Sequence, residues 1–151
     1  MRREREAAVT IEAAAERDLP AVRRLLESHG LPLDGVDDNV STMVVARDGA
    51  DVVGAAAVEL YTDGALLRSV VVSRAVQGQG LGHRLTEAAL SVARDRGART
   101  AFLLTTTAER FFPRLGFEPI SRDDVPASVR TSIEFQSACP ASAVVMRKRL
   151  A

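Results

Sequence analysis

The spacing of apolar residues along this chain alternates between two periods and predicts a mixed α/β fold. Apolar residues at every second position, or in short continuous runs, predict strands, and apolar residues three and four positions apart predict helices. The expected strands are Val9–Glu12, Met43–Arg47, Val52–Tyr61, Ala65–Val72, Ala101–Thr106, Phe117–Ile120 and Ala143–Leu150. The expected helices are Glu16–His29, Leu81–Arg96, Ala108–Leu115 and a further one that begins at Pro126. Leu31–Asn39 fits either a loop or a short helix.

The segment Leu81–Arg96 is the longest amphipathic stretch of the chain. Its apolar residues fall on one helical face, and Gly97 is a natural C-terminal stop. By contrast, the expected helix Ala108–Leu115, which Thr107 is placed to cap, contains Pro113. Because proline lacks a backbone N–H, this second helix should be shortened or kinked.

Turn signals between the strands indicate how they are connected. Asp48-Gly49 separates the second and third strands, and glycine accepts the positive φ that a tight hairpin turn needs. A second turn at Asp63-Gly64 leads into a strand, helix and strand in succession. The pattern therefore predicts a mixed, mostly antiparallel sheet flanked by helices.

Length and charge describe one ordinary globular domain. The chain has 151 residues and no internal repeat or linker, which predicts a single domain over residues 1–151. Its 20 Lys and Arg balance its 20 Asp and Glu, so neither nucleic acid nor an anionic membrane is an expected partner. No apolar run approaches the ~18 residues that span a bilayer, and no apolar stretch follows the charged N-terminus as in a secretory signal.

Cysteine and histidine usage points to a reducing compartment without a metal centre. The single cysteine, Cys139, cannot form an internal disulfide, so the expected location is the cytoplasm. Its position next to Pro140 favours a packed thiol over a reactive one. The two histidines, His29 and His83, have no metal-ligand spacing, so no metal site is expected.

A glycine-rich loop between a valine-rich strand and the long helix carries the clearest chemical signal. The strand ends at Val70–Val72, and the loop Gln77–Gly82 opens the helix. The first turn of a helix has unpaired N–H groups and the positive end of the helix dipole, which together bind phosphate, and glycines let an anion approach. A dinucleotide fingerprint is excluded because His83 stands where its third glycine is required, and a P-loop is excluded because no lysine is present.

Two motifs in this order resemble those of the GNAT acetyltransferases. Gln77, Gly80 and Gly82 match the family's pyrophosphate loop, Gln-x-x-Gly-x-Gly. The segments Leu103–Ala108 and Phe111–Phe117 are similar to the family's fifth strand, next helix and closing Gly-Phe. The resemblance implies the GNAT fold, with a central sheet splayed between strands four and five, and it implies acetyl-CoA as the co-substrate.

The resemblance also implies where acetyl-CoA binds. The pantetheine arm is expected beside Val70, Val71 and Val72, where the backbone N–H of Val71 or Val72 would polarise the thioester carbonyl. Phe112 is expected to pack along the cofactor. The pyrophosphate is expected on the amides of Gln77, Gly78, Gln79, Gly80, Leu81, Gly82 and His83.

The expected reaction is direct attack of a neutral amine on the thioester, and the chain departs from the family at both assisting residues. Leu66 stands where many members have a glutamate, so Glu59 is the nearest candidate base, acting through water; a solvated strand-end carboxylate is the alternative. Phe112 stands where the family often has a tyrosine acid, and the only tyrosine in the chain, Tyr61, is the remaining candidate. An α-amino group of pKa ~8 is about a tenth neutral at pH 7, so strong base assistance is not essential.

Arg68 is the candidate residue for recognising the acceptor. It alternates with Leu66 and Val70 along its strand, and an arginine that faces the cleft can clamp a substrate carboxylate bidentately. A surface salt bridge is the alternative. Thr105 and Thr106 are candidates for presenting hydroxyls to the substrate, although threonine is common in strands.

A narrower resemblance concerns the C-terminal part of the chain. Val125–Arg130 and Glu134–Ala143, together with Leu67–Val70 and Leu103–Thr107, resemble the arsenic-resistance N-acetyltransferases. The threonine-rich segment and the late helix also resemble the acetyltransferase domain of N-acetylglutamate synthases. Both resemblances imply an amino-acid-like amine. A single cysteine cannot chelate trivalent arsenic, so a resistance role would act through acetylation of an amine, including an organoarsenical one.

Three hypotheses remain open at this point. The first is an acetyltransferase for a small amine or amino-acid analogue, and the second is an amino-acid acetyltransferase of biosynthesis, which Leu66 weakens. The third is a non-catalytic acetyl-CoA-binding module, suggested by Phe112 and the missing glutamate. The expected partner is a small-molecule amine, and a homodimer is the candidate assembly.

Overall fold

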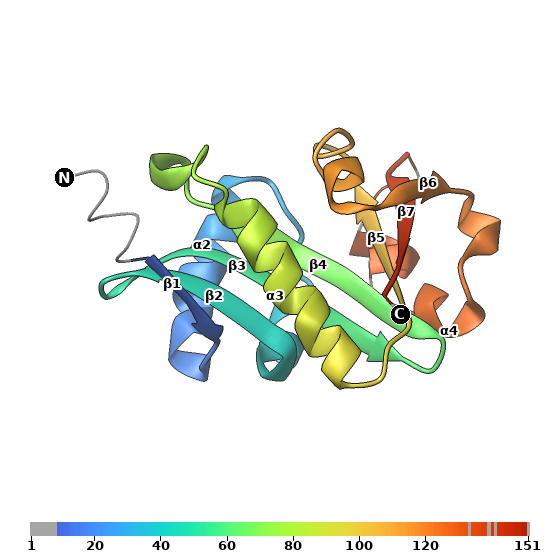
Figure 1. The fold of residues 1–151 in the computed structure, drawn as a ribbon, viewed down its shortest axis with the longest axis horizontal. Coiled ribbons are helices and arrows are strands. Elements are labelled where there is room, and N and C mark those ends of the chain that lie inside the picture. Colours follow the sequence, from blue (N-terminus) through green and yellow to red (C-terminus); the bar gives the residue numbers. More distant parts are fainter. Residues whose placement is uncertain (1–8, 133, 139, 141, 151) are drawn as a thin grey trace.

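The computed structural model describes residues 9–132, 134–138, 140 and 142–150 (Figure 1). Within these residues, seven strands form one sheet in the order β1-β2-β3-β4-β5-β7-β6. Only β4 and β5 run parallel to each other; every other neighbouring pair is antiparallel. The predicted mixed, mostly antiparallel sheet is therefore confirmed. The strands are β1 Val9–Ala13, β2 Met43–Asp48, β3 Asp51–Tyr61, β4 Gly64–Val72, β5 Thr100–Thr105, β6 Glu118–Ile120 and β7 Val144–Arg149.

Helices cover both faces of this sheet. Helix α3 (Leu81–Asp95) crosses one face of β2, β3 and β4, and α2 (Leu19–Ser28) lies on the opposite face (Figure 1). The short helix α4 (Ala127–Arg130) covers β4 near the turn that joins it to β3. Within the described ranges, no helix has both the length and the apolar character needed to cross a bilayer. The remaining turns are η1 Glu16–Asp18, η2 Val36–Thr42, η3 Arg74–Val76, η4 Phe112–Leu115, η5 Arg122–Asp124 and the π turn η6 Glu134–Ala138.

Two of the three apolar clusters among the described residues lie on the opposite faces of β3 and follow from the alternation of side chains along the strands. On one face, Leu85 and Leu90 of α3 are fully buried in the same cluster as Val58 of β3. On the other face, Val22 and Leu26 of α2 are fully buried in a cluster with β2, β3 and β4. Because neighbouring strand residues point to opposite faces, β3 and β4 contribute to both clusters.

Three local predictions were wrong, each for a local reason. The segment Ala108–Leu115 forms only the turn η4, and Pro113, which has no N–H to donate, stands near its start. The hydroxyl of Thr105, not that of Thr107, accepts hydrogen bonds from the N–H groups of Thr107 (3.3 Å) and Ala108 (2.9 Å). Pro126 is the cap before α4 and not its first residue. Cys139 lies outside the described residues.

The predicted helix Glu16–His29 begins later than expected, at Leu19, because a buried ion pair closes a separate turn before it. Asp18 Oδ2 accepts the N–H of Ala15 at 2.8 Å, and its two oxygens accept from Arg47 Nη1 at 2.8 Å and Nη2 at 2.6 Å. The hydrogen bonds from Arg47 hold the pKa of the Asp18 carboxyl below its ordinary value, against the effect of burial.

We expect Asp18→Asn to lower the free energy of unfolding at pH 7 by about 1–2 kcal/mol, since a charged hydrogen-bonded pair is broken. A carboxyl with a depressed pKa in the folded state stabilises the protein above its unfolded pKa of about 3.9 and loses this effect as the pH falls through the folded value. The difference between wild type and variant in urea unfolding should therefore vanish in acid. A difference that stays constant from pH 7 to pH 3 would contradict this assignment.

Candidate functional site

The two parallel strands separate and leave a cleft of about 440 Å³ between their C-terminal halves. Their pairing is limited to Ala65 with Ala101 and Leu66 with Phe102. Beyond those pairs, β4 continues to Val72 and β5 to Thr105, so the facing backbone edges have no strand partner across the gap. The predicted splay between strands four and five is confirmed. The cleft is also lined by the segment 29–32, Arg74, Gln77, the segment 106–108, Phe112, Glu134 and Pro140.

A β-bulge in β4 shapes the wall of the cleft. Ala57 pairs with Arg68 but Ala55 pairs with Val71, so Ser69 and Val70 together stand opposite one residue of β3. Ser69 has a φ of 59°, and among the described residues no other non-glycine residue has a positive φ. Such a conformation is costly for serine and is typical of bulges at functional sites.

The bulge leaves one valine amide directed toward the cleft. The N–H of Ser73 donates to Val53 in β3 at 2.7 Å. Because successive N–H groups of a strand point to opposite edges, the N–H of Val72 is directed toward β5 and that of Val71 toward β3. Of the two amides predicted to polarise a carbonyl, the geometry therefore favours Val72.

The glycine loop lies where β4 meets α3. Gly78 and Gly80 have φ values of 84° and 77°, in the left-handed region that favours glycine. A Cβ built on either residue would meet no atom within 4 Å, so the space in front of the loop is open. Gly80 caps α3 without a side-chain hydrogen bond. The first N–H groups of α3 are thus available to an anion.

Two further residues of the motif have structural roles that the sequence does not reveal. A Cβ on Gly82 would lie 3.1 Å from the ring of Phe111, so this glycine makes room for a phenylalanine. The side-chain amide of Gln77 donates to the carbonyl of Val72 at 3.1 Å and ties the loop to the end of β4. Leu81 is buried in the core, and His83 is exposed on the first turn of α3.

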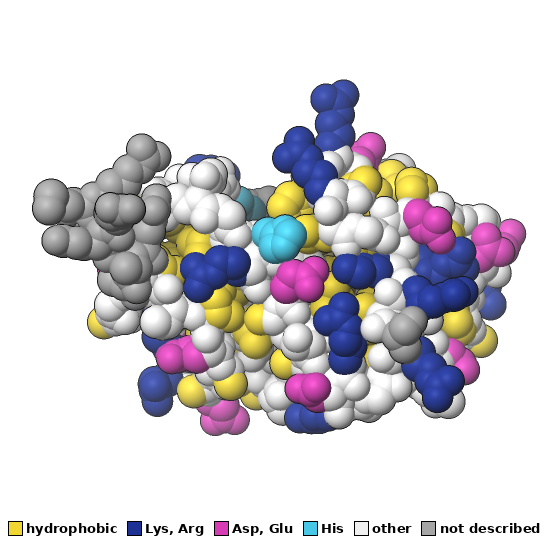
Figure 2. Space-filling model, in the orientation of Figure 1, with side chains coloured by type: hydrophobic (Ala, Val, Ile, Leu, Met, Phe, Trp, Pro, Cys, Tyr) yellow, Lys and Arg dark blue, Asp and Glu magenta, His cyan; other side chains and the backbone are white. Residues whose placement is uncertain are grey.

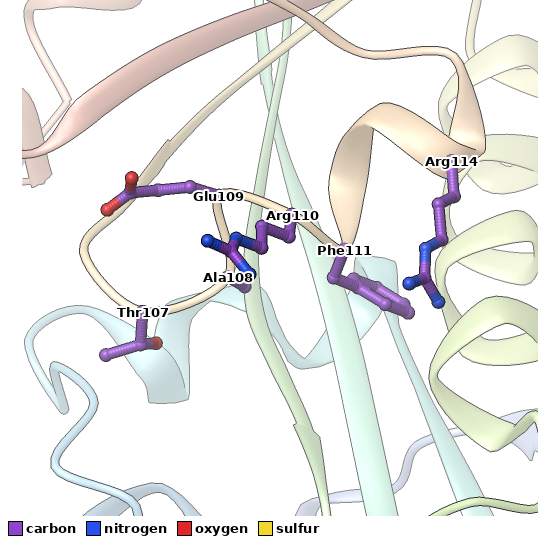
Figure 3. Close-up of a pocket in the computed structure, with 6 residues that line it drawn as sticks. All are labelled: Thr107, Ala108, Glu109, Arg110, Phe111 and Arg114. Atoms are coloured by element: carbon purple, nitrogen blue, oxygen red, sulfur yellow. The ribbon is translucent and has the colours of Figure 1, made fainter.

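A second hollow, of about 460 Å³, lies on the segment between β5 and η4 (Figure 3). In Figure 3, Arg110 and Arg114 lie on either side of Phe111, and Arg114 extends toward α3. Lys and Arg side chains project from the surface over this segment in Figure 2. Since Phe111 packs against Gly82, this basic hollow adjoins the N-terminal end of α3.

Phe112 and the predicted threonines lie along the cleft. Phe112 is 7% exposed and contacts Phe111 and Phe117 edge to face, with ring centroids 5.0 and 5.8 Å away. Thr105 is buried and its hydroxyl accepts the two loop hydrogen bonds described above, whereas Thr106 is exposed. Thr106 is therefore the freer of the two hydroxyls.

Arg68 lines the cleft but is not a surface residue, so the alternative of a surface salt bridge was wrong. Its side chain has no exposed area. Nη1 donates to Glu59 Oε2 at 2.8 Å, Nη2 donates to the carbonyl of Asp34 at 2.5 Å, and Nε donates to Ser69 Oγ at 3.2 Å. Glu134 Oε2 lies 3.5 Å from Nε. Arg68 thus joins the bulge, two carboxylates and the segment before η2.

Glu59 and Tyr61 lie behind Arg68, in a neighbouring hollow that also contacts Asn39. Glu59 accepts hydrogen bonds from Tyr61 Oη at 2.5 Å and from Asn39 Nδ2 at 3.1 Å. Burial, and then the hydrogen bond to Glu59, raise the pKa of Tyr61 well above its ordinary value. Tyr61 therefore stays protonated at neutral pH, and its O–H donates a hydrogen bond to Glu59.

Two cleft residues were missed by the sequence analysis as parts of the site. Glu134 is 4% exposed and reaches the cleft from η6. His29 ends α2, as expected, but its ring also matters: Nδ1 lies 2.8 Å from the carbonyl of Leu25, and Nε2 is buried without a hydrogen-bond partner among the described residues. His29 belongs to no motif, and the segment Glu134–Ala143 contributes only to the narrower resemblance, which gives Glu134 no role.

Comparison with known proteins matches this chain to a family. The family described as Acetyltransferase (GNAT) domain matches residues 39–119. An amino-acid acetyltransferase of Mycobacterium tuberculosis is 30% identical over 138 residues, which cover 84% of this chain and 78% of that protein.

Solved structures agree with this match. A Mycobacterium tuberculosis protein in complex with CoA has a TM-score of 0.80 and 27% identity, covering 94% of this chain and 99% of that one. The N-acetylglutamate synthase of Neisseria gonorrhoeae, complexed with coenzyme A and N-acetyl-glutamate, has a TM-score of 0.81. At 24% identity that second likeness shows the fold alone, and this chain covers only 35% of the synthase. None of these three relatives supports the narrower resemblance to arsenic-resistance enzymes.

Proposed function

Because this chain belongs to the GNAT acetyltransferase family, we propose that it transfers the acetyl group of acetyl-CoA to the amino group of a free amino acid. Family membership makes the chain an acyltransferase that uses acetyl-CoA as its co-substrate. The choice of acceptor is the proposal. The observation that carries it is the 30% identity to an amino-acid acetyltransferase over most of the length of both proteins.

The residues present suit the arm and the diphosphate of acetyl-CoA. The gap between β4 and β5 suits an extended arm, since the backbone edge of β4 faces it without a strand partner. The open amides at Gly80 and the start of α3 suit a diphosphate. Arg110 and Arg114 add positive charge beside the same helix end. When bound, acetyl-CoA supplies the acetyl group in activated form, as a thioester.

Within this proposal, residues of the chain orient acetyl-CoA and polarise its thioester carbonyl. The Val72 N–H donates to the carbonyl oxygen that gains negative charge during transfer, a contribution that strengthens in the transition state. Phe112 forms an apolar wall on the β5 side and excludes water. Positioning of this kind supplies effective molarities of about 10⁵–10⁸ M, so transfer does not depend on the family's usual glutamate and tyrosine.

Arg68 is the proposed point of contact for the acceptor's carboxylate. A guanidinium has five N–H donors, and the three contacts to Glu59, Asp34 and Ser69 leave two hydrogens on Nη1 and Nη2. The contacts hold the planar group still just behind the surface of the cleft, which preorganises it for bidentate recognition. Since the side chain has no exposed area, contact with the carboxylate requires the residues that cover it to move aside. In this arrangement Glu59 and Tyr61 position Arg68. The exposed hydroxyl of Thr106 is a further donor on the β5 side.

A panel of acceptors tests the proposal. Thiol release from acetyl-CoA should be measured with each of the twenty amino acids, simple primary amines and an organoarsenical amino acid, with mass spectrometry of the products. We expect N-acetylated amino acids, with glutamate and glutamine tried first, and at least about tenfold lower kcat/KM for the matching amine without its carboxylate.

Other outcomes of the panel assign the protein differently. A preference for simple amines over every amino acid would reject the proposed acceptor class. A preference for the arsenical would favour the narrower resemblance. Acetyl-CoA binding without turnover of any amine would favour a binding module.

A further inference from the structure

Glu134 is a buried carboxylate on the cleft wall to which the proposed function gives no role. It is the first residue of η6, its side chain is 5% exposed, and it lines the cleft together with the ends of β4 and β5. Its Oε2 lies 3.5 Å from Arg68 Nε, next to the bulge at Ser69. It is therefore a charged group on the wall of the cleft, beside the bulge that precedes the Val72 amide.

Arg68 is shared unequally between two carboxylates. Nη1 donates a hydrogen bond to Glu59 at 2.8 Å, whereas Glu134 lies 3.5 Å from Nε, which donates to Ser69. The other groups that contact Arg68 and Glu59 are neutral: the Asp34 carbonyl, the Ser69 hydroxyl, the Asn39 amide and the Tyr61 phenol. Arg68 therefore holds Glu59 more closely than Glu134. A carboxylate on the cleft wall, as Glu134 is, attracts a cation that enters the cleft.

The two carboxylates are not equivalent. Glu59 accepts from Asn39, Tyr61 and Arg68 and lines the neighbouring hollow. Glu134 lines the cleft itself. Leu66, which is expected at the position of the family's usual glutamate, cannot act as a base in place of Glu134. It has no exposed area and packs in an apolar cluster with Phe102, Val125, Val129 and Val145.

An independent observation also indicates a ligand with N–H donors. A backbone carbonyl only accepts, so the 2.8 Å contact to Leu25 places the proton of neutral His29 on Nδ1. Nε2 then carries a lone pair, and it is buried without a partner among the described residues. Leaving such an acceptor unsatisfied is unusual in native proteins. His29 lines the same cleft as Glu134.

We propose that Glu134 is the residue that receives the acceptor's amine. Its carboxylate binds the ammonium form, which predominates at pH 7, and takes one proton from it. The freed electron pair of the nitrogen forms the C–N bond as the C–S bond breaks with its pair on sulfur. The second proton of the nitrogen goes to that thiolate, and CoA leaves as the thiol. This inference rests on the acetyltransferase activity and applies to any primary amine, whether or not the acceptor is an amino acid.

The pH profile of Glu134→Gln tests the proposal, because glutamine keeps the shape of the side chain but neither carries charge nor takes a proton. With the best acceptor of the panel, wild-type kcat/KM should be flat below the pKa of the amine, since the ammonium is the bound form. The variant can use only the neutral amine, whose fraction rises about tenfold per pH unit below the pKa of the amine. Its kcat/KM should therefore rise about tenfold per pH unit up to that pKa. At pH 7 we expect a loss of about 100-fold. The rise in melting temperature with acetyl-CoA should be unchanged.

Matched variants separate this role from a structural one. Glu134→Asp retains the charge and should keep the flat profile at a reduced rate. This variant also tests the proposal if the glutamine variant does not fold. Glu118→Gln removes an exposed carboxylate that pairs with Arg147 on β7 and should match wild type. A flat profile in Glu134→Gln, or a tenfold-per-unit slope in Glu59→Gln, would overturn the proposal. Failure of all amino acids as acceptors overturns only the proposed function, because the same measurements then use the amine that is acetylated.

Discussion

Replacing Gly80 by valine is expected to abolish the rise in melting temperature that acetyl-CoA gives the wild-type protein. At a concentration of 100 times Kd, a ligand that binds only the native state stabilises it by about 2.7 kcal/mol, which for a chain of this size is several degrees. Valine at φ 77° is sterically disfavoured, and its methyl groups would occupy the open space in front of the first amides of α3. Differential scanning fluorimetry with and without acetyl-CoA measures both effects.

Gly97→Val is the matched control for this loss. Gly97 follows the other end of α3, has a φ of 91°, and a Cβ there also meets no atom within 4 Å. Both variants should lose about 1–2 kcal/mol from the strained backbone, because both place a branched residue in the left-handed region. Only Gly80→Val should lose the response to acetyl-CoA. An undiminished response in Gly80→Val would show that the diphosphate binds elsewhere.

Arg68→Met is expected to cause the largest loss of stability of any substitution proposed for this protein. Methionine fills most of the volume of the arginine stem but leaves Glu59 and Glu134 without the guanidinium between them. Removing one partner from a buried charge cluster typically costs about 3–5 kcal/mol. Chemical denaturation at pH 7 should show this loss as a lower midpoint with an unchanged slope, and the melting temperature should fall by roughly 10–15 °C.

Two variants bracket the effect of Arg68→Met. Arg23→Met removes an ion pair with Asp37 in which both side chains are about half exposed, and it should leave the midpoint within error of wild type. Arg68→Lys keeps the charge but not the planar fork, so it should fall between wild type and Arg68→Met. A midpoint for Arg68→Met close to that of Arg23→Met would mean that the cluster is not buried in solution.

The regular elements and the cofactor loop were predictable because their signals are local. Hydrophobic periodicity located every strand and both long helices to within a few residues. The glycines at positions 78 and 80 indicated the left-handed backbone that the loop has there. Local signals failed where two weak preferences competed. Around Pro113 the apolar spacing favoured a helix, but the missing N–H and the hydroxyl of Thr105 favoured a turn.

The candidate acceptor site could be predicted only in part. Arg68 was identified from its place on the strand, but its burial and its two carboxylate partners were not, because Glu59 and Glu134 reach it from β3 and from η6. The contact of Gly82 could not be predicted either, since the ring that it accommodates belongs to Phe111 beyond the next strand. Contacts between distant segments leave no periodic trace in the sequence.

The sequence by itself determined the order of strands and helices and the glycine loop at the head of α3. Each of these depends on residues that are neighbours in the chain, where spacing and backbone preference act directly. The tertiary structure alone decided which polar side chains share the cleft. Arg68, Glu134 and His29 meet there because the parallel strands separate after two residue pairs and a bulge turns β4 at Ser69, so that segments far apart in the chain close around one gap.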